Sequence, residues 1–489
     1  MTRQYISDVI TIDEIKKWVP GNRILICSMT GSGKSSMIKN QLYDYAKSIN
    51  KQILLMSNRS LLKKQNEFDL KDKLDFITLE NYQSFESKIL KGTDDIKSLF
   101  EPYYFICEDE IHYGFSDSAF NQNTDLLLRH LKDTPKDKIF LFLTATPEVL
   151  LDYQPDFDYV YNLPRDYSYI KTVYFYDKNS KKNEKAIEAI IRNIPKNEKV
   201  LYFGSSVKDI YNLFLKFEDS AFICSDGNKL KDKSDKKVLE SIEQESFFEP
   251  HILFATKVLD NGVNIKDDAL KHVIIDTYDF VSFIQMLGRK RSMHPDDKIN
   301  LYVKSYHKGQ LSYIIKGIDK KLKDMERTEI IINNNLEGQY PEYSFNKDGT
   351  ADPKINIAKY QHYKTQKRIL QKIMDNKNED AFARYICKLL GKDIRYTKDA
   401  FMEFEKLSLK EIVERYVGVK MFQDTQTTFK NMFFSTIFTA KKMDYSSRGI
   451  QTINNILEED GLDYILYSKR ETSGSRRNKA YWLMTRKSK

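Results

Sequence analysis

The sequence predicts an α/β fold: two units in tandem, each built on a parallel sheet, followed by a mostly helical C-terminal region. Three observations predict it. Short apolar runs alternate with helical patterns through the first third of the chain, the alternation restarts at about residue 166, and it stops after residue 306. Apolar runs of about four to eight residues between helical stretches are typical of parallel strands covered on both faces.

Composition permits this fold and excludes several classes. The chain has 489 residues, of which 41% are hydrophobic and 30% charged, with only 18 glycines and 11 prolines. This length corresponds to about three domains at roughly 150 residues each. The balance is that of a globular protein and excludes collagen-like and low-complexity chains. We expect boundaries that divide the chain into 1–165, 166–308, 309–356 and 357–489.

The cysteines and the apolar runs argue against metal and membrane classes. The four cysteines, Cys27, Cys107, Cys224 and Cys387, lie far apart, with no CxxC pair and no Cys/His cluster, so no zinc site is expected. No run approaches about 18 apolar residues, and the N-terminus has no apolar core of a signal peptide. We expect a cytoplasmic protein without a membrane partner.

The elements follow in order. The expected strands of the first unit are 23–28, 52–57, 75–80, 103–109 and 139–145. Those of the second unit are 172–177, 200–205, 221–226, 251–256, 272–276 and 300–306, with helices at 184–193 and 207–217 between them. A helix at 309–332 follows, and residues 333–356, rich in Asn, Gly and Pro, are expected to be a linker.

The C-terminal region is predicted to be helical and to end in a winged-helix-like module. Ser408 and Glu411 have the spacing of a capping box. Ser447 precedes a helix that Gly461 would end. Two strand-like runs at 464–470 and 478–484 follow, joined by a turn. Helix, strand, basic turn and strand is the order at the end of a winged helix-turn-helix.

A phosphate loop follows the first strand. The segment SMTGSGKS, residues 28–35, stands between an apolar strand and a helical stretch, which is the context that a P-loop requires. Its glycines let backbone N–H groups converge on phosphate oxygens, Lys34 meets the β- and γ-phosphates, and Ser35 can ligate Mg²⁺. Ser28 stands where the first glycine is usual. The expected nucleotide-binding residues here are Thr30, Gly31, Ser32, Gly33, Lys34 and Ser35.

An acidic turn follows another strand of the same unit. Asp109 and Glu110 leave the apolar strand 103–107 at its C-terminal end. Carboxylates at this position beside a P-loop strand suit Mg²⁺ coordination and water activation. We expect Asp109 to hold the metal together with Ser35, and Glu110 to orient and deprotonate the attacking water.

Taken together, these motifs resemble those of superfamily 2 helicases of the DExH type. MTGSGKS (29–35), DEIH (109–112) and the Thr144-Ala145-Thr146 run resemble motifs I, II and III. SNR (57–59) and YQS (82–84) resemble strand-contacting motifs. VLYFGSS (200–206), ATKVLDNGVNI (255–265) and QMLGRKR (285–291) resemble motifs IV, V and VI. The resemblance covers about residues 20–305. The residues of motifs V and VI are most like those of helicases from phages, plasmids and other mobile elements.

The resemblance implies two RecA-like domains with ATP and Mg²⁺ in the cleft between them. His112 and Gln285 would couple the ATP state across the cleft, and Thr144 and Thr146 would link hydrolysis to domain movement. Gly262 and Asn264 would lie near the nucleotide. Arg289 and Arg291 would reach the γ-phosphate as arginine fingers. The residues implied to face nucleic acid are Asn58, Arg59, Tyr82, Gln83 and Thr256.

Two departures from the family pattern stand out. Motif VI commonly has its second arginine seven residues after the glutamine, where this chain has Ser292, so Arg291 is expected to serve instead. No adenine-reading glutamine motif precedes the P-loop. Trp18 could stack on adenine, but a packing role is the better interpretation.

The charge distribution points to a polyanion at the C-terminus. The net charge is +9, from 79 basic and 70 acidic residues. Residues 466–489 hold eight basic residues and one acid, which is +7. The cations at or near the expected hairpin turn are Lys469, Arg470, Arg476, Arg477 and Lys479, and we expect them to contact phosphates.

The sequence therefore predicts an ATP-dependent nucleic-acid helicase or translocase, with DNA favoured over RNA because winged-helix modules usually grip duplex DNA. Two alternatives remain open: a nucleic-acid-activated ATPase that switches or remodels without separating strands, and an origin-binding replication initiator. Partner proteins from replication, recombination or defence are all compatible with the sequence.

Overall fold

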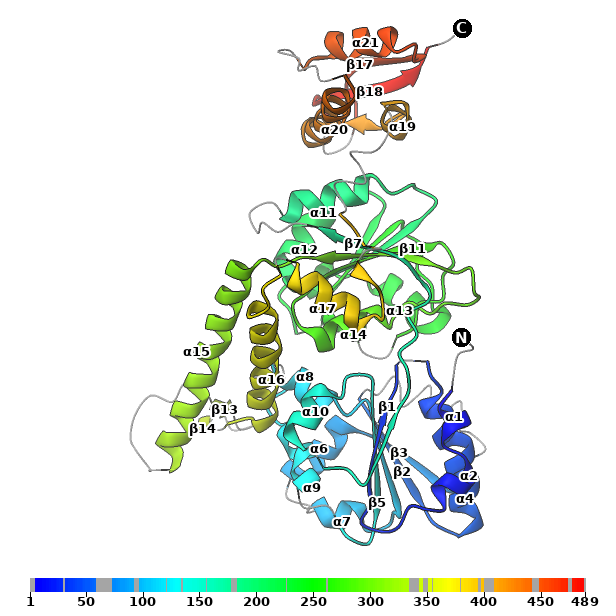
Figure 1. Cartoon of the computed structure of the whole chain (residues 1–489), viewed down its shortest axis with the longest axis vertical. Coiled ribbons are helices and arrows are strands. Elements are labelled where there is room, and N and C mark those ends of the chain that lie inside the picture. Colours follow the sequence, from blue (N-terminus) through cyan, green and yellow to red (C-terminus); the bar gives the residue numbers. More distant parts are fainter. Residues whose placement is uncertain are drawn as a thin grey trace.

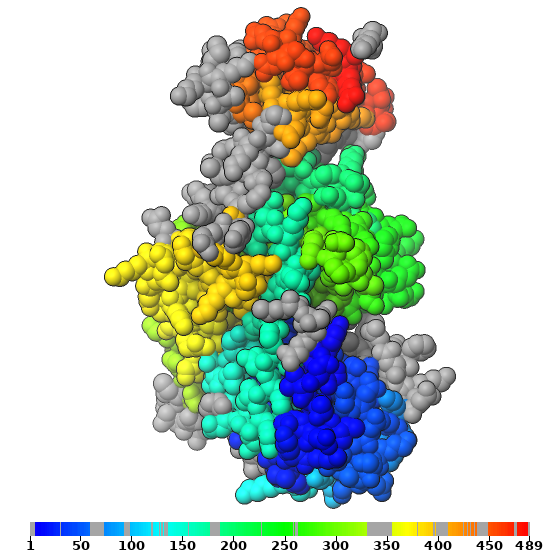
Figure 2. Space-filling view, turned by 45° about the vertical axis from the view of Figure 1, so that its right-hand side comes forward, coloured from blue at the N-terminus to red at the C-terminus, as the bar shows by residue number. Residues whose placement is uncertain are grey.

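The computed structural model stacks three bodies along one axis, with the first sheet at one end, the second sheet in the middle and the C-terminal elements as a lobe at the other end (Figures 1 and 2). The structure describes residues 5–29, 31–58, 73–91, 96–119, 121–132, 135–154, 156–176, 183–225, 227–260, 263–333, 343–345, 351–353, 355–378, 380–394, 397–399, 409–441, 448–473 and 477–487. Among these residues, no helix combines the length and apolarity needed to span a bilayer.

The first unit is a six-stranded parallel sheet with the order β3-β2-β4-β5-β1-β6. Its strands are β1 Arg23–Cys27, β2 Ile53–Ser57, β3 Ile77–Asn81, β4 Phe105–Asp109, β5 Ile139–Thr144 and β6 Tyr159–Asn162. The five predicted strands are confirmed. The sixth, β6, extends the sheet beyond β1 and was not predicted; it is only four residues long, and its side chains are half-buried or exposed.

Helices cover both faces of this sheet (Figure 1). One face packs against α1 Ile6–Val9, α2 Ile12–Ile15, α3 Lys34–Met37, the π-helical turn Ile38–Leu42 and α4 Tyr43–Ser48. The other packs against α6 Tyr82–Leu90, α7 Ile96–Phe100, α8 Tyr113–Ser116, α9 Asp125–Lys132 and α10 Glu148–Tyr153. Trp18 lies in the first core and its indole N–H donates to the Tyr161 hydroxyl at 3.1 Å, so it packs as expected.

The second unit is a seven-stranded sheet with the order β15-β7-β12-β11-β8-β10-β9, again entirely parallel. Its strands are β7 Ile170–Tyr176, β8 Lys199–Gly204, β9 Ser220–Ile223, β10 Ile252–Ala255, β11 Leu270–Asp276, β12 Ile299–Lys304 and β15 Lys398–Asp399. Its helices are α11 Asn183–Arg192, α12 Val207–Phe214, α13 Lys236–Glu245 and α14 Phe280–Leu287. The predicted fold class, two tandem α/β units that are each built on a parallel sheet, is confirmed.

The segment after β12 forms a helical hairpin that ties the two units together. It consists of α15 Lys308–Asn333 and α16 Ile357–Met374, and α17 Ala381–Leu389 follows it (Figure 1). The expected linker 333–356 contains a short antiparallel pair, β13 Tyr343–Phe345 and β14 Ala351–Pro353. α16 packs against α8, α9 and α10 of the first unit, whereas α17 packs on the second unit through Phe382, whose ring centroid lies 5.9 Å from that of Phe280.

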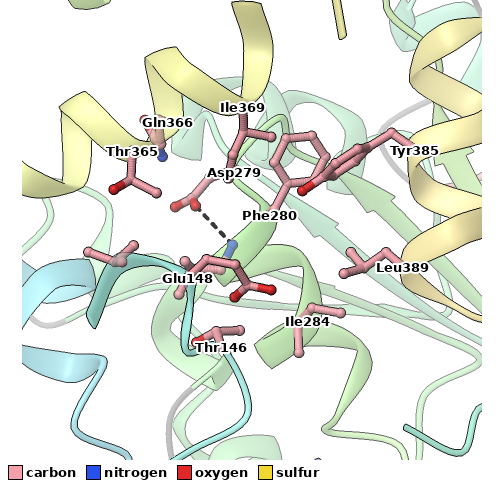
Figure 3. A pocket seen from close by; sticks show the side chains of 12 residues that line it. Thr146, Glu148, Asp279, Phe280, Ile284, Thr365, Gln366, Ile369, Tyr385 and Leu389 are labelled. Carbon is pink, nitrogen blue, oxygen red and sulfur yellow. Dashed lines mark hydrogen bonds between the residues drawn. The ribbon is translucent and has the colours of Figure 1, made fainter. Parts of the chain in front are cut away.

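Polar contacts fix α16 in place. Asn356 caps the helix, and its amide donates to the Thr124 hydroxyl at 3.1 Å and the Asn121 carbonyl at 3.3 Å. Asp152 of α10 accepts from the Thr365 hydroxyl at 2.6 Å and from the Arg368 guanidinium at 3.0 Å. Thr365 and Gln366 thereby face the motif III end of the first unit and Asp279 of the second (Figure 3).

The C-terminal lobe has its own apolar core. It contains α19 Leu409–Arg415, β16 Lys420–Met421, α20 Gln423–Lys441, α21 Ile450–Glu459, β17 Tyr464–Arg470 and β18 Ala480–Arg486. Its sheet has the antiparallel order β16-β18-β17. The predicted helix and hairpin are present, and Gly461 lies just past α21 with φ +65°. The expected cap is wrong: α21 begins at Ile450 with Gly449 as its N-cap, two residues after Ser447. Ser408 and Ser447 lie outside the described residues.

Asn356→Ala tests how much the polar contacts of Asn356 contribute to holding α16 against the first unit. The change removes a helix cap and leaves the buried Thr124 hydroxyl without this donor, so we expect a loss of about 2–3 kcal/mol of unfolding free energy. Thr11→Ala is the matched control, because the exposed Thr11 side chain caps α2 and makes no other hydrogen bond among the described residues, so a loss of about 1 kcal/mol is expected. The measurement is the urea unfolding midpoint. Equal shifts for the two variants would show that Asn356 acts only as a cap.

Candidate nucleotide-binding and catalytic site

The phosphate loop leaves β1 at the edge of the sheet where β5 and β4 also end. Cys27 pairs with Thr144, and Asp109 pairs with Leu143, so the ends of these three strands are level. Parallel pairing therefore brings the loop, the acidic turn and the motif III run to one edge. β5 stands between the loop strand and the acidic strand.

Two glycines shape the loop. Gly31 and Gly33 have φ values of +77° and +87°, in the left-handed region that a side chain strongly disfavours. The N–H of Ile6 donates to the Ser32 carbonyl at 2.9 Å, so α1 braces the loop from outside. The Ser32 hydroxyl donates to the Ser28 hydroxyl at 2.8 Å, which gives the serine in the place of the first glycine a structural role.

Lys34 and Ser35 begin α3 directly below this loop. The Lys34 ammonium is almost fully buried; it donates to the carbonyls of Ser28 at 3.0 Å and Met29 at 3.3 Å. It also lies 3.7 Å from a carboxylate oxygen of Glu110. The Ser35 hydroxyl lies 3.5 Å from Oδ2 of Asp109. The loop and both acids thus converge within one small volume.

The acidic turn has an unusual backbone. Glu110 has a φ of +56°, a conformation that costs a non-glycine residue on the order of 1 kcal/mol or more and is common at functional sites. The buried Tyr82 hydroxyl donates to the Asp109 carbonyl at 2.8 Å, and the N–H of Ile111 donates to the Leu143 carbonyl at 3.2 Å. These bonds hold the strained turn against the sheet.

The electrostatics of the turn separate the two acids. Burial opposes the charge on Glu110, but Lys34, His112 and Arg289 outweigh burial and hold the pKa of Glu110 well below its usual range. Burial and the charge of Glu110 act together to raise the pKa of Asp109. Oδ1 of Asp109 is buried and has no hydrogen-bond donor among the described residues. A cation bound here would satisfy it.

A short polar chain runs from the acidic turn to the end of β5. Nδ1 of His112 lies 3.2 Å from Oε2 of Glu110 and 3.2 Å from the Thr144 hydroxyl. The N–H of Thr146 donates to the same hydroxyl at 3.0 Å. His112, Thr144 and Thr146, which the sequence singled out separately, therefore form one connected group with Glu110.

The second unit presents its arginines on the segment after α14. The Arg289 guanidinium donates to the Gln285 carbonyl at 2.9 Å, to the Gln285 side-chain oxygen at 3.2 Å and to the Val263 carbonyl at 3.0 Å. Nε of Arg291 donates to the Asn264 side chain at 2.6 Å. Gln285 and Asn264 thus orient the two arginines, and no bond between Gln285 and His112 is present among the described contacts.

The arginines face the first unit. Arg289 is close enough to Glu110 for its charge to help lower the pKa of that acid. Arg291 and Asn264 line a cavity of about 390 Å³ together with Met29 and Gly31 of the loop. The Ser292 hydroxyl instead donates to the carbonyls of His294 and Asp297, within its own turn. Arg291 therefore lines the cavity beside the phosphate loop, whereas the Ser292 hydroxyl is bonded within its own turn.

The residues of the two units that were expected to face nucleic acid differ in how exposed they are. Gln83 is exposed on the first turn of α6, whereas Asn58 and Thr256 are nearly buried. Tyr82 requires a correction: its ring is fully buried and stacks on Tyr113 with centroids 5.4 Å apart, so its side chain does not face nucleic acid. It instead positions the acidic turn, a role for which the sequence carries no signal.

The hairpin cations lie as expected where the structure describes them. Lys469 and Arg470 end β17, opposite Tyr481 and Ala480 of β18, and both are exposed. Arg477 and Lys479 are exposed on the other side of the turn. Four predicted site residues, Thr30, Arg59, Gly262 and Arg476, lie outside the described residues.

The donor set fits ATP with Mg²⁺. The Gly31 and Gly33 backbone permits N–H groups to converge on phosphates, and the helix after the loop begins at Lys34. The Ser35 hydroxyl and the Asp109 carboxylate are oxygen ligands of the kind that Mg²⁺ prefers. Among the described residues, no protein donor satisfies Oδ1 of Asp109.

Comparisons with known proteins add no family assignment. The sequence matches no family model and no curated protein. Among solved structures it is similar to S. cerevisiae Dbp5 bound to RNA and ADP BeF3, with 14% identity, a TM-score of 0.45, and coverage of 62% of this chain and 83% of that chain. It is also similar to the E. coli DEAH/RHA helicase HrpB, with 14% identity, a TM-score of 0.42, and coverage of 94% and 61%. Likenesses this distant carry no weight in the assignment of function below.

Glu110→Gln tests the acidic turn. The amide keeps the shape of the side chain but cannot accept a proton, so we expect ATP to bind normally and kcat to fall by about 10²–10⁴-fold, the usual contribution of a general base. Glu101→Gln is the control, because Glu101 is exposed on the same unit away from the loop. Steady-state turnover and equilibrium ATP binding are measured side by side. Turnover at the wild-type rate would remove Glu110 from the chemistry.

Arg291→Ala and Ser292→Ala form a matched pair for motif VI. A cation that meets the transferred phosphoryl group contributes about 10³-fold or more to kcat, so Arg291→Ala should lower kcat on that scale with little change in ATP affinity. Ser292→Ala should stay near wild type, because the hydrogen bonds of its hydroxyl to described residues lie within its own turn. A silent Arg291→Ala beside a severe Ser292→Ala would reverse the assignment.

Proposed function

We propose that this protein is an ATP-dependent helicase or translocase of superfamily 2 that acts on nucleic acid, with DNA favoured over RNA. The observation that carries the proposal is that one cleft receives functional side chains from both units. Lys34, Asp109 and Glu110 stand at the edge of the first sheet, and Arg289 and Arg291 approach from the second. A small-molecule kinase would need neither the second unit nor its arginines.

The residues have distinct roles in the proposed reaction. Lys34 and the loop N–H groups hold phosphates, and Ser35 and Asp109 hold Mg²⁺, which supplies positive charge to the phosphates. Glu110 orients the attacking water and accepts its proton. The neighbouring cations keep Glu110 a charged carboxylate at neutral pH, which is the form that can accept a proton, although its lowered pKa makes it a weaker base. Arg291 stabilises charge on the transferred group only when the two units approach each other.

Hydrolysis would be coupled to movement through groups already in contact. Glu110 is connected to Thr146 through His112 and Thr144. Thr146 lines a pocket together with Asp279 of the second unit and Gln366 of α16 (Figure 3). Loss of the contact between Arg291 and the γ-phosphate would release one unit from the other. Alternating closure and release of two nucleic-acid-binding units is the basis of the proposed translocation.

The C-terminal lobe supports a duplex-binding role. Its element order is helix, strand, two helices and a hairpin, with the first short strand paired to the last strand, which supports the proposal of a winged helix. The cations Lys469, Arg470, Arg477 and Lys479 are exposed at the hairpin end. We propose that this hairpin contacts the phosphate backbone.

The test of function combines two assays on the full chain. ATP turnover is measured with single-stranded DNA, duplex DNA and RNA in parallel, and strand displacement is measured on a partial duplex. The proposal predicts stimulation by nucleic acid, strongest with DNA, together with ATP-dependent displacement. Stimulation without displacement would favour the ATPase switch, and turnover indifferent to every nucleic acid would contradict the proposal.

A further inference from the structure

A second cleft is formed in part by the segment that joins the two units. It has a volume of about 850 Å³ and is lined by residues of that segment, of the start of α10, and of α16 and α17. Four of its lining side chains are cations: Arg165, Lys372, Arg384 and Lys388. We call it the basic cleft. It is separate from the 390 Å³ cavity beside the phosphate loop.

The cations of the basic cleft are arranged along one wall. Lys372 is in the last turn of α16, and Arg384 and Lys388 are one turn apart on α17, so they share a helix face. All three are exposed. Arg384 pairs with Asp380 at 2.8 Å, but within the described parts of the chain no carboxylate lies within ion-pair distance of Lys372 or Lys388. These two carry uncompensated positive charge into the cleft.

The opposite wall belongs to the catalytic edge of the first unit. The Arg165 guanidinium donates to the Ala145 carbonyl at 3.1 Å and to Glu148 at 3.1 Å. Ala145 lies between Thr144 and Thr146, which are connected to His112 and Glu110. The N–H of Leu163 donates to the carbonyl of Cys27, at the end of the loop strand. A ligand in the cleft would therefore contact the segment that is bonded to Ala145 and Cys27, next to the nucleotide site.

The third wall is attached to the second unit. Tyr385 of α17 lies between the basic cleft and the small pocket of Figure 3, with its ring centroid 4.6 Å from that of Phe280. Phe280 begins α14, the helix that leads to Arg289 and Arg291. A ligand that touches α17 and Arg165 together would therefore bridge the two halves of the catalytic cleft.

We propose that the basic cleft binds the phosphate backbone of a single nucleic-acid strand, through Lys372, Arg384 and Lys388, and that the bound strand stimulates ATP turnover through Arg165. The inference rests on the proposed function and adds a strand-binding site to it. A volume of 850 Å³ is in the range of about 300–1,000 Å³ that holds one drug-sized ligand, so a few nucleotides fit and a duplex does not. The half-buried Tyr385 ring offers a surface for a base or sugar.

The test reverses the two uncompensated charges. Lys372→Glu/Lys388→Glu is compared with Lys236→Glu/Lys237→Glu, which makes the same change in net charge on the exposed start of α13, outside the cleft. Binding of a fluorescent single strand, as DNA and as RNA, is measured at several salt concentrations, and ATP turnover is titrated with the same strands. Lys372→Gln/Lys388→Gln is a neutral second variant, and urea midpoints check that each protein is folded.

The proposal predicts a loss confined to the cleft variants. Loss of two phosphate contacts should lower the salt slope of single-strand binding by about 1.4, at about 0.7 per contact. Half-maximal stimulation of turnover should need more strand, and the glutamine variant should fall between wild type and the glutamate variant. The control should bind as wild type does. If the glutamate variant matches wild type, or if the control loses as much, the cleft is not a strand site.

These outcomes are distinct from a failure of the proposed function. A wild-type protein that no nucleic acid stimulates would contradict the proposed function itself. A wild-type protein that is stimulated, beside cleft variants that bind the strand and are stimulated as wild type is, would overturn the strand site alone. Reduced binding with unchanged stimulation would overturn the coupling through Arg165.

Discussion

The parallel pairing of β1, β5 and β4 is the constraint on which the site depends. Because Cys27, Thr144 and Asp109 are level across three adjacent strands, the phosphate loop, the motif III run and the acidic turn emerge together. The strands are buried on both faces, so a shift in register would misplace all three turns at once and would disrupt two apolar cores. The positive φ of Glu110 persists because this frame, together with the Tyr82 hydroxyl, holds it.

The second half of the site is positioned less directly. Arg289 and Arg291 stand on a segment that Gln285, Asn264 and Val263 hold by hydrogen bonds. That segment follows α14, and α14 packs against α16 and α17. α16 in turn is bonded to the first unit through Asp152. The hairpin α15–α16 therefore does more than connect the second unit to the C-terminal lobe, because it is a structural link between the two halves of the cleft.

Most strands of the two sheets and the motifs of the nucleotide site could be predicted from the sequence. Strands buried on both faces are continuous apolar runs, and phosphate chemistry demands Gly, Lys and acids at fixed places, so both leave strong patterns. The packing of α16 against the first unit leaves no such pattern in the sequence. Its buried face includes His362, Thr365 and Gln366, which a pattern of apolar spacing assigns to solvent. β6 is missed for a similar reason, since its side chains are only partly buried. The role of Tyr82 depends on a carbonyl 27 residues away, which no local pattern reports.

The most direct measurement of the central claim is an experimental structure with Mg²⁺ and a non-hydrolysable ATP analogue. The account predicts that the Lys34 ammonium leaves the carbonyls of Ser28 and Met29 for the phosphates, and that the metal lies between Ser35 and Asp109. It also predicts that Arg291 reaches the terminal phosphate from the second unit. Phosphates bound away from the loop, or an Arg291 that stays bonded to Asn264 far from them, would contradict it.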